Sequence, residues 1–376
     1  MDASLRETPN RIARRGFLAK IMKSDFSKWA SVSAVIPCRN EANFIEPCLA
    51  SVLANGYPPD RLEILVIDGL SNDGTREIVR KLSSENSQIR LIDNPECITP
   101  AALNIGISTA TGEVVIRLDA HATYERGYIE RCVDALARYD AGNSGGVWRI
   151  LPRRQGVMAR AVVRALTHRF GGAARYRRAN TREPEFVDLV PFFCCRRETL
   201  QMVGPFNCHL LRHQDFEHST RMRRAGVRFV MVPTAVCNYY TRSDLRSFWV
   251  HSFRDGLWVT LAAAYTDVVP FSIRHLIPMF FTLAVVVGMV GSALSMLMSW
   301  AVTLVVVLYL CVALACAAQV AVEELDLRMV ALMPLVFFGR HLLFGAGALI
   351  GAVRALVTRE FWRHHGFKRS PASAAQ

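Results

Sequence analysis

Short apolar runs alternate with amphipathic stretches through the first third of the chain. Strand-like runs occupy residues 32–37, 64–67, 89–92 and 114–118, and helical segments lie between them at 41–55, 76–82 and 99–109. The runs are apolar on both faces, which is typical of parallel strands covered by helices. The pattern therefore predicts an α/β domain with a mostly parallel sheet. Ligands of such sheets bind at the carboxyl ends of the strands, where Asp68 and Asp119 both lie.

The pattern changes after Gly145-Gly146. Residues 150–182 are basic and show no clear strand, whereas residues 186–193 are largely apolar again. We expect two helices and a final strand at 198–203, 217–225 and 227–232. Residues 247–265 mix aromatic and apolar residues with Arg254, which predicts a helix at a membrane interface.

The last third of the chain has the composition of a membrane region. No charged residue or histidine occurs from Leu276 to Val322, a run long enough for two spans of about 20 residues each. Three apolar segments cover 276–299, 301–322 and 329–353, and Arg340-His341 interrupts the third. The basic tail predicts a cytoplasmic C-terminus. Two spans with an interfacial or re-entrant third segment would place the preceding domain in the cytoplasm as well.

Charge and cysteine content narrow the class of partner. The net charge is +13, and the stretch Arg149–Arg182 holds ten arginines without a carboxylate. Next to membrane segments, anionic lipid or a phosphate-bearing substrate fits this stretch better than nucleic acid, although a solvated surface is a simpler alternative. The ten cysteines form no CxxC pair, which favours reduced thiols in the cytoplasm. Arg14-Arg15 resembles an export signal, but Lys23, Asp25 and Lys28 interrupt the apolar stretch that such a signal needs.

Two acidic motifs follow predicted strands. Asp68 opens the segment Asp68-Gly-Leu-Ser-Asn-Asp-Gly-Thr75, and its carboxylate could accept hydrogen bonds from a base or ribose. Asp119 and His121 are separated by one residue, so both could bind one Mg²⁺ or Mn²⁺ ion together with diphosphate oxygens. Helix capping by Asp119 and core packing of His121 are the simpler alternatives.

A third acidic segment precedes a predicted helix. Asp215 could act as a general base, and Glu217 could support it or pair with Arg221 one helical turn later. A capping aspartate with a surface ion pair has the same spacing. Spacing alone leaves these two interpretations open.

Taken together, these motifs resemble family 2 glycosyltransferases with the GT-A fold. The resemblance covers about residues 31–255 and includes the segment from Val35 to Glu41 besides the three acidic motifs. Several further segments are similar to bacterial succinoglycan-type exopolysaccharide glucosyltransferases: residues 117–122, 187–192 with 196–198, 204–206, and 345–347 after His341.

The resemblance implies roles for individual residues. Nucleotide-sugar binding falls to Pro37, Arg39, Glu41, Asp68, Arg117, Asp119 and Arg254. Asp119 and His121 stand where the family binds its Mn²⁺ or Mg²⁺, and Asp215 matches the catalytic base, with Glu217 and His251 in support. The sequence departs from the family pattern at His121, where an aspartate is usual, and at Gln214, where glutamate is usual. Phe170-Gly-Gly-Ala173 also lacks the Gly-Asn pattern of similar proteins.

We therefore expect a membrane-anchored, inverting, metal-dependent hexosyltransferase. It would move a hexose, with glucose as first candidate, from a UDP-sugar to a polyprenyl-diphosphate-linked saccharide in exopolysaccharide biosynthesis. Further expectations are binding to membrane lipid, contact with other polysaccharide-assembly proteins, no nucleic acid, and an inner-membrane location with the catalytic domain in the cytoplasm. A processive polysaccharide synthase and an inactive scaffold of the same fold are the alternatives. The expected domains are a lead segment (1–30), the GT-A domain (31–246), an interfacial helix (247–272), membrane helices (273–355) and a basic tail (356–376).

Overall fold

The computed structural model describes residues 29–172, 183–267, 273–358 and 360–362. The chain divides into two compact units. The sheet unit contains residues up to 155 together with 166–242, and the helical unit contains 156–165 and the residues from 243 onward. Residues 1–28 of the predicted lead segment and most of the predicted basic tail lie outside the described residues.

The first half of the sheet unit has the alternating pattern that the sequence predicts. Its parallel strands are β1 (Val32–Cys38), β2 (Leu62–Asp68), β3 (Ile89–Asp93) and β4 (Val114–Arg117). The intervening elements are α2 (Ile45–Leu53), the 3₁₀ turn η1 (Pro59–Arg61), α3 (Thr75–Glu85) and α4 (Thr99–Thr109). The strand order is β3-β2-β1-β4, and nearly every residue of β1 and β2 is buried because helices cover both faces.

The second half of the sheet unit makes the sheet mixed. It adds β5 (Ala122–Tyr124), β6 (Asn143–Pro152), β7 (Glu185–Val187), β8 (Cys194–Arg196) and β9 (Phe229–Thr241). Its helices are α5 (Tyr128–Arg138), α7 (Arg197–Val203) and α8 (Gln214–Arg224). Strand β8 pairs antiparallel with both β4 and β6, and β9 pairs antiparallel with β5 and β7. The first four strands are parallel as predicted, and β6 also pairs parallel with β9. The sheet as a whole is mixed, because β8 and β9 also pair antiparallel with strands that are distant along the chain.

Apolar side chains form a core on each face of this sheet. One cluster joins the strands to α2 and α5, and the other joins them to α4, α7 and α8. Helix α4 lies so close to β1 that a side chain at Gly106 would clash with Val35. All ten cysteines are free thiols, and burial raises the pKa of Cys194 to about 12, so this thiol stays protonated.

The helical unit consists mainly of five helices within the described residues. They are α6 (Val157–Thr167, whose last two residues belong to the sheet unit), α9 (Leu245–Leu261), α10 (Ile277–Ser292), α11 (Met296–Glu324) and α12 (Arg328–Val357). Short 3₁₀ turns at Ala262–Ala264 and Ile273–Leu276 precede α10. The segments Ile273–Ser292, Met296–Glu324 and Arg328–Val357 are each long and apolar enough to cross a membrane. The turn between the first two lies at residues 293–295, earlier than the boundary near residue 300 that the sequence indicated, because no charge or proline marks it.

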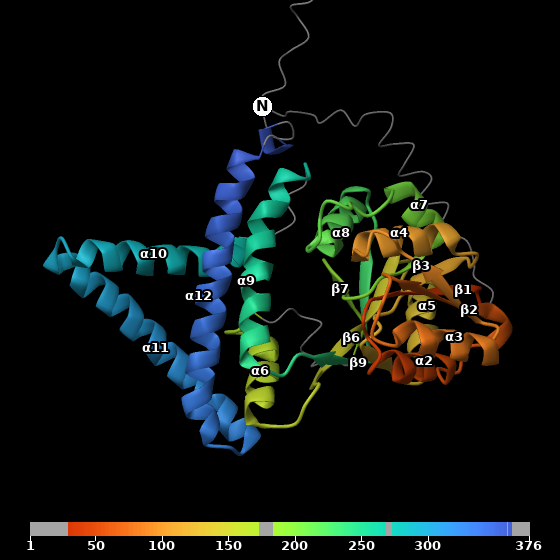
Figure 1. The fold of residues 1–376 in the computed structure, drawn as a ribbon, viewed down its shortest axis with the longest axis horizontal. Coiled ribbons are helices and arrows are strands. Elements are labelled where there is room, and N and C mark those ends of the chain that lie inside the picture. Colours follow the sequence, from red (N-terminus) through yellow and green to blue (C-terminus); the bar gives the residue numbers. More distant parts are fainter. Residues whose placement is uncertain (1–28, 173–182, 268–272, 359, 363–376) are drawn as a thin grey trace, which may run out of the picture. The chain divides into compact units, whose positions relative to one another are not determined.

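Helix α12 packs along α9 through glycines, and the two helices lie side by side (Figure 1). Gly347 lies against the backbone of Phe253, and Gly351 lies against the backbone of Leu257. Thr260 donates a hydrogen bond of 2.7 Å from Oγ1 to the carbonyl oxygen of Ala348. Because contacting residue numbers rise together in both helices, α9 and α12 run parallel. The glycines of α12 thus permit a close approach of two helix backbones.

Candidate active site

Except for Asp215 and Glu217 on α8, the predicted site residues of the sheet unit lie at or just beyond the carboxyl ends of the central parallel strands. Strand pairing places Cys38 at the end of β1 opposite Asp68 at the end of β2. On the other side of β1, Val35 pairs with Arg117, the last residue of β4. Asp119 and His121 follow β4 directly, so the sheet brings the motifs of three strands to one edge.

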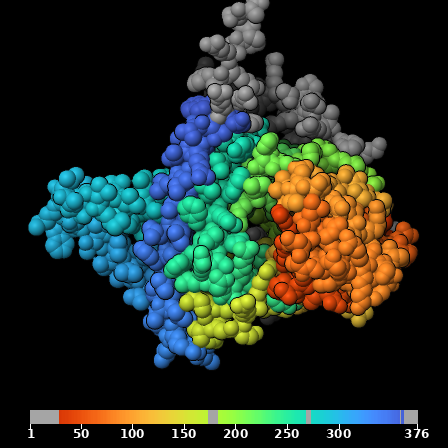
Figure 2. All heavy atoms as spheres, viewed as in Figure 1, coloured from red at the N-terminus to blue at the C-terminus, as the bar shows by residue number. Residues whose placement is uncertain are grey.

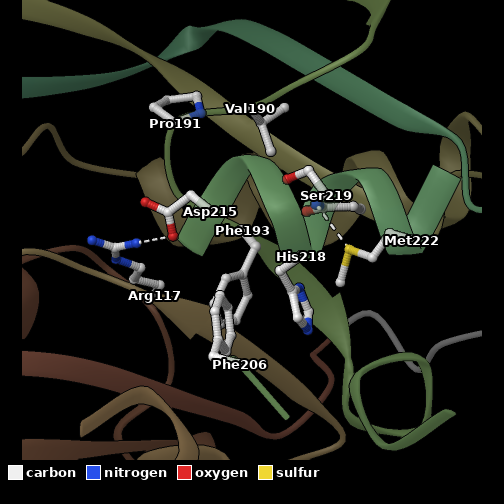
Figure 3. A pocket seen from close by; sticks show the side chains of 10 residues that line it. Arg117, Val190, Pro191, Phe193, Phe206, Asp215, His218, Ser219 and Met222 are labelled. Atoms are coloured by element: carbon white, nitrogen blue, oxygen red, sulfur yellow. Dashed lines mark hydrogen bonds and ion pairs between the residues drawn. The ribbon is translucent and has the colours of Figure 1, made fainter. Parts of the chain in front are cut away.

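Arg117 connects two of the predicted acidic residues. Its Nε donates to Oδ1 of Asp119 at 3.1 Å, and its Nη1 donates to Oδ1 of Asp215 at 2.5 Å (Figure 3). The arginine is only 6% exposed. Burial lowers the pKa of Arg117, but the charges of Asp119 and Asp215 outweigh burial and raise it, so the guanidinium stays charged. One buried cation therefore holds the predicted metal-binding carboxylate and the predicted base together.

Asp215 lies in the first turn of α8, and its side chain is 35% exposed. The residue before the helix, His213, has a φ of 62°, which turns the chain sharply into α8. Asp215 is therefore not the helix cap that its spacing also allowed. A small pocket beside it is lined by Arg117, Asn143, Val190, Pro191, Phe193, Phe206, Asp215, His218, Ser219 and Met222 (Figure 3). This partly exposed carboxylate at the rim of a pocket can accept a proton from a bound hydroxyl.

Other residues of α8 have structural contacts. Glu217 is buried and forms a bidentate ion pair with Arg221, with distances of 2.7 and 3.1 Å. His218 stacks on Phe206 with ring centroids 4.0 Å apart. Gln214 is also buried, and its Oε1 has no hydrogen-bond partner among the described residues. Of the two alternatives for Glu217, the structure thus has the ion pair with Arg221.

His121 contacts two protein side chains through its ring nitrogens. Its Nδ1 lies 3.0 Å from Oε1 of Glu41, and its Nε2 lies 2.8 Å from the hydroxyl of Tyr239. A carboxylate such as that of Asp119 is a ligand that Mg²⁺ and Mn²⁺ prefer, so Asp119 fits a divalent cation. Metal binding by His121 requires the ring to give up one of these contacts. Its role as a ligand stays a prediction, and the described residues contain no cluster of three potential metal ligands.

Glu41 is held from two sides. Besides His121, it contacts Nη2 of Arg153 at 3.4 Å. Arg153 in turn lies over the ring of Phe44, 4.3 Å from the ring centroid. This arrangement fixes the loop after β1 next to the loop after β4.

Asp68 is buried and already accepts several hydrogen bonds. Ser71 donates to it from its backbone N–H at 2.9 Å and from its hydroxyl at 2.5 Å. Arg76 forms an ion pair with it at 2.7 Å, and the side chain of Asp68 has no exposed surface. These contacts shape the loop before α3, and nucleotide binding by Asp68 stays a prediction that requires the loop to open.

The remaining predicted residues lie in both units. In the sheet unit, Pro37 is half-buried in β1, and Arg39 is exposed with Nη1 donating to the carbonyl oxygen of Cys97 at 3.1 Å. His251 and the exposed Arg254 lie on α9 of the helical unit. Their roles next to the donor stay predictions.

The sequence analysis missed two residues that contact the predicted site, Tyr239 and Arg153. Strand pairing places Tyr239 of β9 opposite Ala122 of β5, which brings it to His121 from more than 100 residues away. From the sequence, Arg153 was recognised only as one of the arginines in the stretch Arg149–Arg182. No local spacing signals either contact, because both depend on how β6 and β9 join the sheet.

Comparison with known proteins identifies the family. Glycosyl transferase family 2 matches residues 33–201. The succinoglycan biosynthesis protein ExoA of Rhizobium meliloti is 32% identical over 233 residues, which are 61% of this chain and 69% of ExoA. The chain belongs to glycosyl transferase family 2. A further relative of this family 2 glycosyltransferase is a dolichyl N-acetyl-α-D-glucosaminyl phosphate 3-β-D-2,3-diacetamido-2,3-dideoxy-β-D-glucuronosyltransferase of Methanococcus voltae, 25% identical over 58% of this chain and 69% of that protein.

A solved structure confirms the fold of this family 2 glycosyltransferase. The mannosyltransferase PcManGT from Pyrobaculum calidifontis, solved in complex with GDP-Man and Mn²⁺, matches 93% of this chain and 95% of its own with a TM-score of 0.54 and 21% identity. The sheet unit has the GT-A fold, and a helical region with three potential membrane helices follows it. The protein is thus a glycosyltransferase of polysaccharide or glycan biosynthesis.

Proposed function

We propose that this glycosyltransferase moves a hexose, with glucose as first candidate, from a UDP-sugar to a lipid-linked saccharide with inversion of configuration. One observation carries the proposal: Arg117 contacts both Asp119 and Asp215. Asp119 is predicted to lie at the donor diphosphate, and Asp215 is predicted to activate the acceptor. Only the side chain of Arg117 therefore separates them. The name of ExoA supports an acceptor on the path to exopolysaccharide.

Asp215 is the general base of the proposed reaction. Its carboxylate takes the proton from an acceptor hydroxyl while that oxygen attacks the anomeric carbon, and the nucleoside diphosphate leaves from the opposite face. Arg117 orients Asp215, because its buried guanidinium donates a hydrogen bond of 2.5 Å to Oδ1 of this carboxylate. A single displacement assisted by one base inverts the anomeric centre.

The donor diphosphate lies beside Asp119 in this proposal, with Pro37, Arg39, Glu41 and Asp68 around the nucleotide. Asp119, and His121 if its ring is released from Glu41 or Tyr239, would hold a Mn²⁺ or Mg²⁺ ion. When bound, such an ion neutralises charge on the leaving diphosphate. A role of Arg254 at the donor diphosphate, which the family resemblance implies, stays a prediction.

The membrane location of the proposed enzyme follows from its C-terminal helices. We propose the inner membrane, with the catalytic domain (31–246) in the cytoplasm and the basic tail on the same side. The acceptor would be a saccharide on a polyprenyl diphosphate, whose tail lies in the bilayer. The Arg149–Arg182 stretch no longer offers all of its charges to this diphosphate, because Arg149, Arg153, Arg160 and Arg164 contact carboxylates. Arg177 and Arg178 lie outside the described residues.

Two measurements test the proposal. The first is a screen of nucleotide sugars by thermal shift with and without Mn²⁺, in which UDP-glucose should raise the melting temperature most. The second is UDP release in membranes that supply the acceptor. Asp215→Asn should lose transfer by at least about 10²-fold and still bind the donor, and Asp215→Glu is the matched control that keeps the charge. Transfer by Asp215→Asn at the native rate would remove Asp215 from the mechanism, a ladder of products would favour a processive synthase, and no turnover with any donor would favour an inactive scaffold.

A further inference from the structure

Two arginines of α6 form ion pairs with the corner between α11 and α12. Arg164 contacts Glu324 at 2.5 Å and Glu323 at 3.1 Å. Arg160 contacts Glu324 at 3.4 Å and also pairs with Asp326. All of these residues belong to the helical unit. The acidic side chains of this corner are mostly covered, since Glu324 is 17% and Asp326 is 10% exposed.

These ion pairs fix the side of the membrane on which the corner lies. The residues before and after α6 belong to the sheet unit, and α6 has only 11 residues with two arginines in ion pairs. A helix of this length and charge does not cross a bilayer, so α6 stays on the side where the sheet unit lies. The end of α11 and the start of α12 must therefore lie on that side too.

Helices α10 and α11 have the features of a hairpin inserted in a bilayer. Arg274 and His275 precede α10, and Glu323 and Glu324 stand at the end of α11, whereas no Asp, Glu, Lys, Arg or His lies between them. Many large apolar side chains along both helices are exposed, among them Val287, Leu308 and Leu314. Figure 2 shows that, away from α12, no other described part of the chain covers α10 and α11 on the face in view. An uncharged apolar surface that extends along two helices of this length is typical of contact with the acyl chains of a bilayer.

Helix α12 differs from α10 and α11, although it is also apolar. Gly347 and Gly351 lie against the backbone of α9, and Gly339 lies against the side chain of Trp249 on the same helix, whereas Gly345 lies against Pro278 at the start of α10. Helix α9 carries exposed arginines at positions 246 and 254 and a half-buried aspartate at 255. If α12 crossed the bilayer, α9 would be carried into it with these charges, which is unfavourable.

We propose that α10 and α11 enter the bilayer as one hairpin, while α12 lies along α9 at the membrane surface. Both ends of α12 are then on the side of the sheet unit, and the basic tail follows there. The partner of the exposed α10–α11 surface is the acyl-chain region of a lipid bilayer. This inference concerns the helical unit and does not depend on the donor or the acceptor.

Substituted cysteines test the arrangement in the full-length protein. Four native cysteines that are not buried, Cys97, Cys208, Cys311 and Cys316, are first changed to Ser or Ala. Single cysteines are then placed at exposed positions at the start and end of α12, Leu327→Cys and Val357→Cys, which are 85% and 76% exposed. Ser84→Cys on the exposed surface of α3 marks the side of the sheet unit.

A membrane-impermeant maleimide is added to intact spheroplasts and to inverted membrane vesicles, and detergent-solubilised protein gives the total reactive thiol. In inverted vesicles we expect all three cysteines to react to more than about 80% of the extent measured in detergent. In spheroplasts we expect all three to be protected. Reaction of Val357→Cys from the side opposite to Ser84→Cys would show that α12 spans the bilayer and would overturn the proposal. Opposite labelling of Leu327→Cys, or labelling of either α12 position only in detergent, would overturn it as well.

Discussion

Replacing Arg117 tests whether one buried cation organises the proposed site. In Arg117→Met the carboxylates of Asp119 and Asp215 lose their shared partner, while the apolar stem of the side chain is kept. Removing one member of a buried ion pair costs about 3–5 kcal/mol. Because the side chains of Asp119 and Asp215 are 14% and 35% exposed, water compensates part of this loss, and we expect about 2–3 kcal/mol. For a unit of this size that lowers the melting temperature by roughly 4–12 °C.

The same substitution should also lower the rate of transfer strongly, beyond what the lost stability explains. Without Arg117, the carboxylate of Asp215 is no longer held at the pocket, and misplacing a general base costs about 10²–10⁴-fold in rate. Arg117→Lys keeps the charge, but one ammonium group cannot reproduce the fixed fork of a guanidinium between two carboxylates. We expect this variant to recover most of the stability and little of kcat.

The assay combines thermal melting in detergent micelles with UDP release in membranes that contain the acceptor. Arg149→Met is the matched control, because Arg149 pairs with Glu125 at 2.5 Å but is 55% exposed; it should cost less than about 1 kcal/mol and leave kcat unchanged. If Arg117→Met melts and turns over like the native enzyme, the buried bridge has no part in the site.

Further predictions concern pH, metal and helix packing. Burial, with a smaller contribution from a neighbouring arginine, lowers the pKa of His218 to about 3 in the folded protein. The pKa of an unfolded histidine is about 6.5. The contribution of neutral His218 to stability is therefore complete above pH 6.5 and is lost as pH falls toward 3. The melting temperature should therefore fall less between pH 6.5 and 4.5 in His218→Gln than in the native protein, and equal slopes would contradict this. EDTA should abolish transfer and Mn²⁺ should restore it, whereas Asp119→Asn should show no Mn²⁺-dependent thermal shift with donor; full activity in EDTA would exclude a required metal. Gly351→Val should clash with the backbone of Leu257 and cost about 1–3 kcal/mol in micelles, with the exposed Ala331→Val on the same helix as control; equal melting of both variants would show that α12 does not need this close contact.

The sequence predicted the first half of the fold well, because its signals are local. Buried strands such as Ile64–Ile67 show up as continuous apolar runs, and helix α3 follows a turn-rich segment. The second half escaped prediction where tertiary contacts decide. Helix α6 looked like part of a basic stretch, because its arginines find carboxylates only some 160 residues later. Strand β9 runs to Thr241 rather than residue 232, since its polar end pairs with β5 and β6.

The candidate site was predicted as a list of residues and not as an arrangement. Asp119 and Asp215 could be named from motifs, but nothing in the sequence showed that Arg117 joins them. The same holds for His121, whose contacts with Glu41 and Tyr239 arise from strand pairing. Asp68 shows the opposite case, because its own loop supplies Ser71 and Arg76 and satisfies most of its hydrogen-bonding capacity locally.

The pairing of α6 with the α11–α12 corner has a consequence for the order of events on the ribosome. Arg164 is synthesised 160 residues before Glu324, and at about 5–20 residues per second its partner emerges roughly 10–30 s later. During this interval the carboxylates that pair with α6 in the structure have not yet been synthesised. Helix α6 thus reaches its final contacts in the helical unit only after α11 has been translated.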